Sequence, residues 1–150
     1  MVRQAMREIP PARVVATRQL RERGTRRRVV VVVGTPARRS TGEYACPWQL
    51  RGVGDGQVRY TFGVDSMQAL QLSFEAIRQA LLPSRESLTW CDGETGGLGF
   101  TRTVNTAFGR TLSDRLDRML EEEMERYARG TKARVAARQR RAARRPSYRR

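Results

Sequence analysis

The chain has 150 residues, the length of one domain with extensions, and a net charge of +15. No segment approaches the ~20 apolar residues that a membrane span needs, so we expect no membrane partner and a cytoplasmic protein. The sequence contains no histidine, which removes the commonest general base, the Ser-His and Cys-His nucleophile pairs and most zinc sites.

The positive charge lies at the two ends of the chain. Residues 1–42 carry +9, residues 43–125 carry −5, and residues 126–150 carry +11 without one acidic residue. Nearly all of the cations are arginine, because Lys132 is the only lysine. This distribution indicates an ordinary folded middle and basic extensions, although a genome-wide bias towards arginine would account for part of the N-terminal excess.

The N-terminal part of the chain predicts two strands after a leader. Residues 1–11 end in two prolines, and we expect them to form a flexible leader. Residues 12–21 alternate apolar and polar side chains, as a strand with one buried face does. The five valines at 29–33 predict a second strand that is covered on both faces or at one end. Arginines on both sides of it serve either as gatekeepers against aggregation or as an anion patch: Arg26, Arg27 and Arg28 before it, and Arg38 and Arg39 after it.

Two further alternating segments, residues 44–52 and 58–62, flank a glycine-rich turn and predict an antiparallel pair. In the first segment three apolar residues share a face: Cys46, Trp48 and Leu50. In the second segment the shared apolar face consists of Val58, Tyr60 and Phe62. Pro47 cannot donate to a ladder and indicates an edge position or a strand start. We expect a helix to lie across the apolar face of this pair.

The clearest helix of the sequence spans residues 65–82. Asp65 is suited to cap its first turn, and Gln68 stands where a capping-box partner belongs. Four apolar residues recur at i, i+4, i+7 and i+11 and form one stripe: Leu70, Phe74, Ile77 and Leu81. Their burial stabilises the fold by roughly 6–12 kcal/mol, at about 1.5–3 kcal/mol each. Pro83 ends the helix.

The remaining sequence predicts a hairpin, a second helix and a tail. Residues 88–90 and 98–100 flank a glycine-rich turn, which is typical of two short strands or a short β-hairpin. Residues 103–130 contain a long helix that is capped by Thr111 or Ser113 and ends near Gly130. Residues 131–150 are rich in alanine and arginine, so they have helical propensity but little to bury. We expect this tail to be disordered on its own.

Four motifs in the middle of the chain have a characteristic order and spacing. They are Cys46-Pro47-Trp48-Gln49-Leu50, Gly52-Val53-Gly54-Asp55, Gly63-Val64-Asp65-Ser66-Met67-Gln68-Ala69-Leu70-Gln71-Leu72 and Leu98-Gly99-Phe100. In this arrangement the chain resembles an uncharacterised family of small bacterial domains of unknown function. The resemblance covers roughly residues 12–102 and implies a compact α+β domain, without catalytic residues that carry over. The second helix and the basic tail lie outside it.

Catalytic and metal-binding interpretations have simpler structural alternatives. Cys46 and Cys91 have no paired or metal-site spacing, so both are expected to be reduced thiols, with Cys46 a nucleophile only if an unusual group activates it. Asp55 and Asp65 could form a catalytic carboxylate pair, but each has a simpler structural role: Asp55 in the turn and Asp65 as the helix cap. The glycines at 52–56 lie between two strands, where no helix N-terminus faces a phosphate. We therefore expect no catalytic residues, no metal and no cofactor.

The arginine-rich arm at the C-terminus has the clearest expected partner. Arginine suits phosphate through bidentate hydrogen bonds, and an arm of this kind binds RNA or DNA with little sequence choice. Tyr148 is a candidate for stacking on an unpaired base. The expected binding residues are those of the N-terminal patch and of the arm: Arg26, Arg27, Arg28, Arg134, Arg138, Arg140, Arg141, Arg144, Arg145, Arg149 and Arg150.

The fold class expected from these patterns is α+β, with a four-stranded antiparallel meander over residues ~12–62 packed by one helix. The leading functional hypothesis is a non-enzymatic protein whose arm binds nucleic acid. The alternative is a protein-protein interaction or immunity-like accessory domain without a nucleic-acid role. Self-association is a related alternative, in which the arm pairs with the Glu121–Glu125 cluster of another copy.

Overall fold

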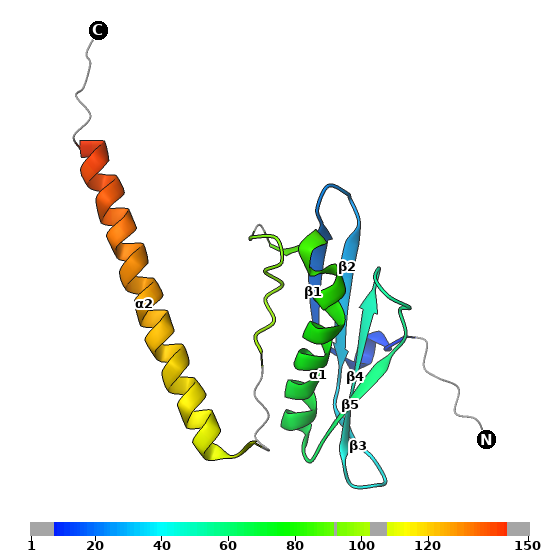
Figure 1. Cartoon of the computed structure of the whole chain (residues 1–150). Coiled ribbons are helices and arrows are strands. Elements are labelled where there is room, and N and C mark those ends of the chain that lie inside the picture. Colours follow the sequence, from blue (N-terminus) through cyan, green and yellow to red (C-terminus); the bar gives the residue numbers. More distant parts are fainter. Residues whose placement is uncertain (1–7, 92, 103–107, 144–150) are drawn as a thin grey trace. The chain divides into compact units, whose positions relative to one another are not determined.

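A computed structural model describes residues 8–91, 93–102 and 108–143, with side chains as far as residue 136. The chain divides into two units, Met1–Thr103 and Val104–Arg150. The first unit contains an antiparallel sheet with one long helix lying across it, and the second contains a single long helix (Figure 1). The α+β class expected from the sequence is therefore confirmed.

The central part of the sheet is the expected four-stranded meander, in the order β1-β2-β4-β5 with every pair antiparallel. The strands of the sheet are β1 (Val14–Glu22), β2 (Arg28–Gly34), β3 (Ala37–Arg38), β4 (Tyr44–Arg51), β5 (Arg59–Gly63) and β6 (Leu88–Trp90). Tyr44 and Ala45 pair with both β3 and β5, so β3 lies on the β2 side of β4 and extends that side of the sheet. The short strand β6 adds to the opposite edge, beside β1.

The expected hairpin between residues 88–90 and 98–100 is wrong. β6 pairs with β1 instead, with Leu20 opposite Trp90 and Glu22 opposite Leu88. Residues 98–100 form no strand, and Gly99 has a φ of +73°, which is incompatible with extended backbone. Without β6, the edge of β1 that faces away from β2 would have no partner strand among the described residues; β6 pairs with its last three residues, Leu20 to Glu22.

The two faces of β5 are the reverse of the expected ones. Tyr60 and Phe62 lie on the face of the sheet opposite to the core, and each is 43% exposed. The reason is register: Trp48 faces the core and pairs with Arg59, so odd-numbered residues of β5 share the core side. The apolar face expected for β4 is confirmed, because Cys46, Trp48 and Leu50 are all buried.

The helix α1 (Ser66–Leu81) is capped as expected but presents a shifted face to the sheet. Asp65 Oδ1 accepts from the Gln68 amide at 2.7 Å, while Gln68 Oε1 accepts from the Val64 amide at 2.8 Å. The buried positions of the helix are Ala69, Ser73, Ile77 and Leu81, whereas Leu70 and Phe74 are only partly buried. Small residues lie at the contact because the helix passes close to β5: Thr61 Oγ1 donates to the Ala69 carbonyl at 3.0 Å.

The strand β2 is covered on both faces, as its five valines predict. Val31 and Val33 join the core under α1, and Val32, which points to the other face, is only 2% exposed. Part of the expected leader contributes to this second cover. Ile9 is 1% exposed and lies beside Gly34, so the residues around Ile9 do not form the flexible leader expected from the sequence. A 3-10 turn, Pro11–Arg13, connects this segment to β1.

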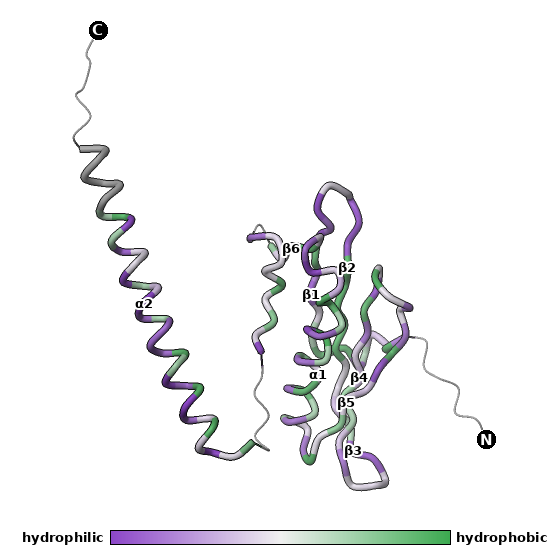
Figure 2. The backbone as a smooth tube through the Cα atoms, in the orientation of Figure 1, coloured by the Kyte–Doolittle hydropathy of each residue, from purple (hydrophilic) through white to green (hydrophobic). Residues whose placement is uncertain are grey.

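The second unit contains α2 (Arg110–Ala143), which is longer than expected. It begins before Thr111 and continues through Gly130, and residues 131–143 are part of the same helix instead of a separate coil. The favourable propensity of alanine and arginine offsets the one glycine, which costs about 1 kcal/mol in a helix. Polar and apolar residues alternate along the described part of this helix (Figure 2).

In the first unit, the short 3-10 segment Leu82–Ser87 follows α1.

Candidate nucleic-acid interface

The arginines expected to bind nucleic acid fall into two groups that belong to different units. Arg26 and Arg27 lie in the turn between β1 and β2, and Arg28 is the first residue of β2; all three are exposed. In the second unit Arg134 is exposed on α2, and the same helix carries Arg138, Arg140 and Arg141. The last four expected residues lie outside the described part of the chain: Arg144, Arg145, Arg149 and Arg150. Tyr148 also lies outside it.

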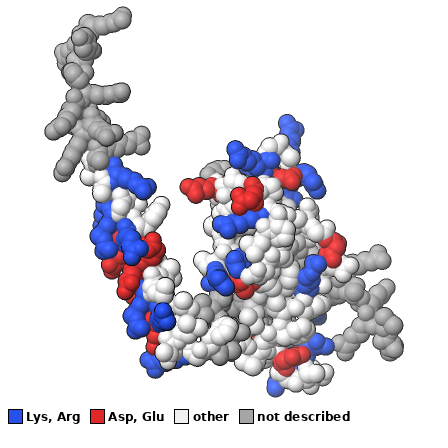
Figure 3. Space-filling view, viewed as in Figure 1, with Lys and Arg blue, Asp and Glu red and all other residues white. Residues whose placement is uncertain are grey.

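The N-terminal arginine group is partly engaged within the protein. Arg27 lies 3.9 Å from a carboxylate oxygen of Glu22, and Arg28 Nη1 donates to Gln19 Oε1 at 3.4 Å. These contacts are long and exposed, so they contribute little to stability and leave the guanidinium groups accessible. Figure 3 shows cationic side chains at the end of the sheet that carries this turn, with acidic side chains close by.

The charged residues of α2 change character along the helix. In its first part arginines pair with acids one turn away: Arg126 lies 2.7 Å from Glu123, and Arg129 lies 3.2 Å from Glu125. No acid follows Glu125 in the sequence, so the cations after Arg129 have no carboxylate in the next or previous turn. Acidic and basic side chains are accordingly mixed in the middle of the described helix, and basic ones alone follow (Figure 3). The basic residues without an acidic residue in an adjacent turn therefore begin at Lys132.

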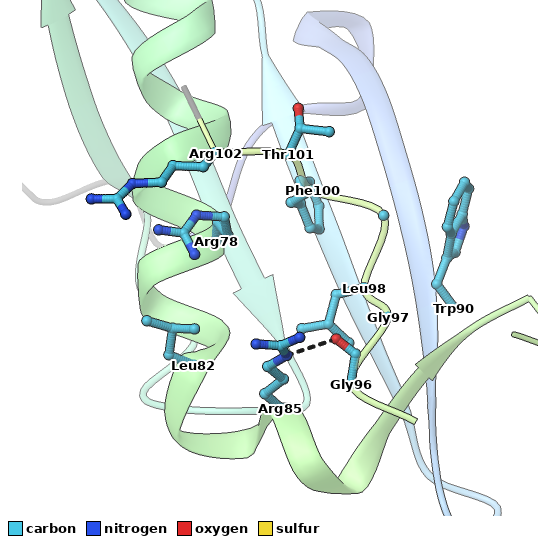
Figure 4. Close-up of a pocket in the computed structure, with 11 residues that line it drawn as sticks. Arg78, Leu82, Arg85, Trp90, Gly96, Gly97, Leu98, Phe100, Thr101 and Arg102 are labelled. Atoms are coloured by element: carbon cyan, nitrogen blue, oxygen red, sulfur yellow. Dashed lines mark hydrogen bonds between the residues drawn. The ribbon is translucent and has the colours of Figure 1, made fainter. Parts of the chain in front are cut away.

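A pocket of about 450 Å³ lies in the first unit, between the end of α1 and the loop that follows β6 (Figure 4). Arginines from three segments line it: Arg78 from α1, Arg85 from the 3-10 segment and Arg102 from the loop. Arg78 is held by a bidentate pair with Glu75, at 2.8 and 2.9 Å, and this pairing raises the pKa of Arg78. Arg85 Nε donates to the Gly96 carbonyl at 2.8 Å, which leaves its two terminal nitrogens available.

Apolar side chains form the rest of this pocket. Figure 4 shows Leu82 on the α1 side and Leu98 and Phe100 on the loop side, with Trp90 beyond them at the end of β6. No acidic residue is among the described residues that line it. The pocket therefore combines an apolar wall with a cationic rim, which is suited to an anion that carries an apolar or aromatic part.

Arg18 connects this pocket to a second one. Its guanidinium carbon lies 4.3 Å from the ring centroids of both Trp90 and Phe100, and Nη1 donates to the Leu98 carbonyl at 3.2 Å. Burial lowers the pKa of Arg18, which the nearby Cys91 partly offsets. Such cation–π contacts fix the positions of both rings.

The second pocket, of about 420 Å³, is also lined by Trp90, which the two pockets share. It is lined by residues of β1, β2 and the end of β6: Thr17, Arg18, Gln19, Arg21, Arg28, Trp90 and Cys91. Arg28, expected from the sequence to bind anions, is therefore brought next to Trp90. Sequence reasoning missed this grouping, because Arg18, Arg28 and Trp90 come together only through the β1–β2 and β1–β6 pairings. The one available signal was a tryptophan among arginines near a glycine-rich segment.

The alternative chemical candidates have structural roles. Cys46 is completely buried, and burial raises its pKa, so it is a protonated thiol packed under α1. Asp55 accepts from the Gln57 amide at 3.1 Å and from Arg59 at 3.0 Å, and these bonds lower its pKa. Asp65 caps α1. Within residues 8–91, 93–102 and 108–143 no group of three His, Cys, Asp or Glu side chains is arranged to hold a metal.

The first unit is thus a small α+β domain in which one helix covers an antiparallel sheet and two cationic pockets flank an exposed tryptophan. Over residues 16–102 the chain matches the family described as Domain of unknown function (DUF6968). This match covers more than half of the chain, so the protein belongs to that family. It includes every residue that lines the two pockets and excludes α2.

No curated protein and no solved structure matches the chain. Among the helices that the structure describes, none has the length and apolar character needed to cross a membrane.

Proposed function

We propose that this protein binds nucleic acid without catalysing a reaction, and that its arginine-rich C-terminal arm makes most of the contacts. The observation that carries the proposal is the charge of +11 over residues 126–150, where no acid is present. Helical backbone as far as Ala143 supports it, since a helix presents the cations after Arg129 at short, regular intervals. Phosphate contacts of this kind position a protein on the backbone and do not read the bases.

The strength of such binding depends on salt. Each phosphate contact releases condensed counterions, so about six contacts give a log–log slope of affinity against salt concentration near −5. The exposed group Arg26–Arg28 of the first unit is available as a second, weaker contact. Phosphate contacts do not distinguish RNA from DNA, because both have the same phosphate groups, so the proposal covers both.

The proposal is tested by filter binding of the full chain and of a chain truncated after Gly130 to one labelled oligonucleotide. The truncated chain retains the first unit and every acidic residue of α2. We expect it to lose the salt-sensitive binding. Unchanged affinity and an unchanged salt slope in the truncated chain would refute the proposal.

A protein partner is the second candidate, and the first half of α2 supplies the observation that favours it. Large apolar side chains recur along one side of this helix and are exposed, from 54% at Met119 to 73% at Tyr127. Capture of a protein by the full chain after nuclease treatment would favour this function. Loss of every captured partner on nuclease treatment would count against it.

We infer that the protein acts in the cytoplasm of a bacterium. A nucleic-acid partner supports this location, as does the presence of two cysteines that form no disulfide, Cys46 and Cys91. The bacterial origin rests on the resemblance described from the sequence.

A further inference from the structure

Trp90 is an exposed aromatic residue in cationic surroundings. It is 39% exposed at the end of the edge strand β6, and it lines both pockets described above. Tryptophan buries much of its surface in most folded proteins, so a half-exposed indole between two pockets requires an explanation beyond packing.

The indole of Trp90 is held rigidly. The guanidinium group of Arg18 stacks on it at 4.3 Å from the centroid, and Arg18 is itself fixed by its bond to the Leu98 carbonyl. Gly99 lies so close to the ring that a Cβ at this position would clash with it. The glycine is therefore required for the contact, and its φ of +73° suits no other residue well. A ring fixed in this way loses little entropy when a ligand stacks on its exposed surface.

Positive charge is available on both sides of this ring. Arg85 and Arg102 line the first pocket, and Arg28 lines the second. The described lining residues of the two pockets include no carboxylate. An aromatic surface lined by cations, without a carboxylate among the described lining residues, matches a strand whose bases are flat and whose flanking groups are phosphates.

We propose that Trp90 stacks on an unpaired base of a single-stranded nucleic acid, whose flanking phosphates lie in the two arginine-lined pockets. This inference rests on the proposed function and deepens it, because it assigns the folded domain a preference for single strands. The bases of a duplex are stacked on each other and have no free face for Trp90, so a duplex contacts the arm alone. Stacking on Trp90 does not discriminate between bases, since every base has a π-face.

The experiment follows Trp90 fluorescence during titration with a uridine or thymidine homo-oligomer and, separately, with a duplex of equal length. The full chain carries a Trp48→Phe substitution, so that Trp90 is the only tryptophan. If this variant does not fold, the wild-type chain is used instead. Trp48 is only 4% exposed, so a bound oligomer cannot contact it. We expect emission to fall as the single strand saturates the protein and to stay constant with the duplex. Saturation is established independently by filter binding.

Two pairs of variants sharpen the test. Trp90→Leu should weaken single-strand binding by about 5- to 100-fold and leave duplex binding unchanged, whereas Trp90→Phe keeps a ring and most of the affinity. Arg102→Gln should reduce the salt slope for a single strand by about 0.7. Arg13→Gln, at an exposed arginine of the first unit outside both pockets, should not change it.

The outcomes separate this inference from the proposed function. Saturation by a single strand without any change in Trp90 emission would overturn the stacking and leave the arm as the binding element. Equal quenching by single strand and duplex would also overturn it. Binding of neither nucleic acid would overturn both the inference and the proposed function.

Discussion

The two cysteines have opposite surroundings and should differ in reactivity. Cys46 is buried and its pKa is raised by desolvation, whereas Cys91 is exposed. Because the thiolate is the reactive form, we expect one thiol per chain to react rapidly with a chromogenic disulfide reagent in native buffer, and two after unfolding. The Cys91→Ser variant should then show no rapid reaction, and rapid labelling of Cys46 in that variant would contradict the structure.

The raised pKa of Cys46 also sets a direction for stability against pH. The folded state holds the thiol proton more tightly than the unfolded chain does. The contribution of Cys46 to stability is therefore fully present below the ordinary thiol pKa and is lost as the pH rises through the raised value. The Cys46→Ala variant lacks this dependence.

Asp65 fixes the start of α1 through one short hydrogen bond, 2.7 Å from its carboxylate to the Gln68 amide. Replacement by alanine leaves that amide without its side-chain partner, so Asp65→Ala should lower the free energy of unfolding by about 1 kcal/mol in urea denaturation. Asp65→Ser is the matched control, because serine also caps helices, and it should lose much less. Equal losses in the two variants would mean that the cap does not determine the start of α1.

At the scale of elements, the packing of α1 against β5 depends on a residue without a side chain. A Cβ at Gly63 would lie 2.5 Å from the Ala69 amide nitrogen, which belongs to helix backbone and cannot move alone. Gly63→Ala should therefore push α1 away from the sheet and cost about 1–3 kcal/mol, as overpacking of a core does. Thermal unfolding measured by circular dichroism would show this loss, and an unchanged transition would contradict the close approach of the two elements.

The glycine in α2 provides the opposite case. Gly130 has no atom near the position of a Cβ, and it lies inside the helix. Gly130→Ala should raise the helical signal in the far ultraviolet and stabilise α2 by about 1 kcal/mol. If the helix ended at Gly130, as the sequence alone suggested, alanine there would remove a C-cap and would not increase helicity.

Elements with a strong local pattern could be predicted from the sequence, and those that depend on register could not. The alternation in β4 and the cap and apolar spacing of α1 are local features, and both elements were found with bounds close to the expected ones. Tyr60 and Phe62 follow the same alternation, but pairing with β4 places them on the outer face. The pattern of a strand shows that its sides differ and does not show which one faces the core.

At the scale of the whole molecule, the candidate site shows the same limit more clearly. Arg18 and Leu98 are hydrogen-bonded although they are 80 residues apart, and Trp90 joins them because β6 pairs with the open edge of β1. No local pattern predicts such a pairing, and the expected hairpin would have placed Trp90 elsewhere. The arm, by contrast, could be read directly from composition, because a run of cations without acids needs no fold to be recognised.

The two units therefore supply different parts of the proposed function. The arm provides charge, which gives affinity without choice. The first unit provides the indole of Trp90 and its arginines, to which we assign the preference for single strands. Under this proposal, the family's domain, residues 16–102, selects the form of the nucleic acid.

The most direct test of the central claim is the slope of log affinity against log salt for two full-length variants of the arm. In one variant the arginines of residues 131–150 become lysine, and in the other they become glutamine. We predict that the lysine variant keeps most of a slope near −5, since about 0.9 is lost per phosphate contact removed, and that the glutamine variant loses most of it. A glutamine variant with the wild-type slope would contradict the claim that the arm binds the phosphates.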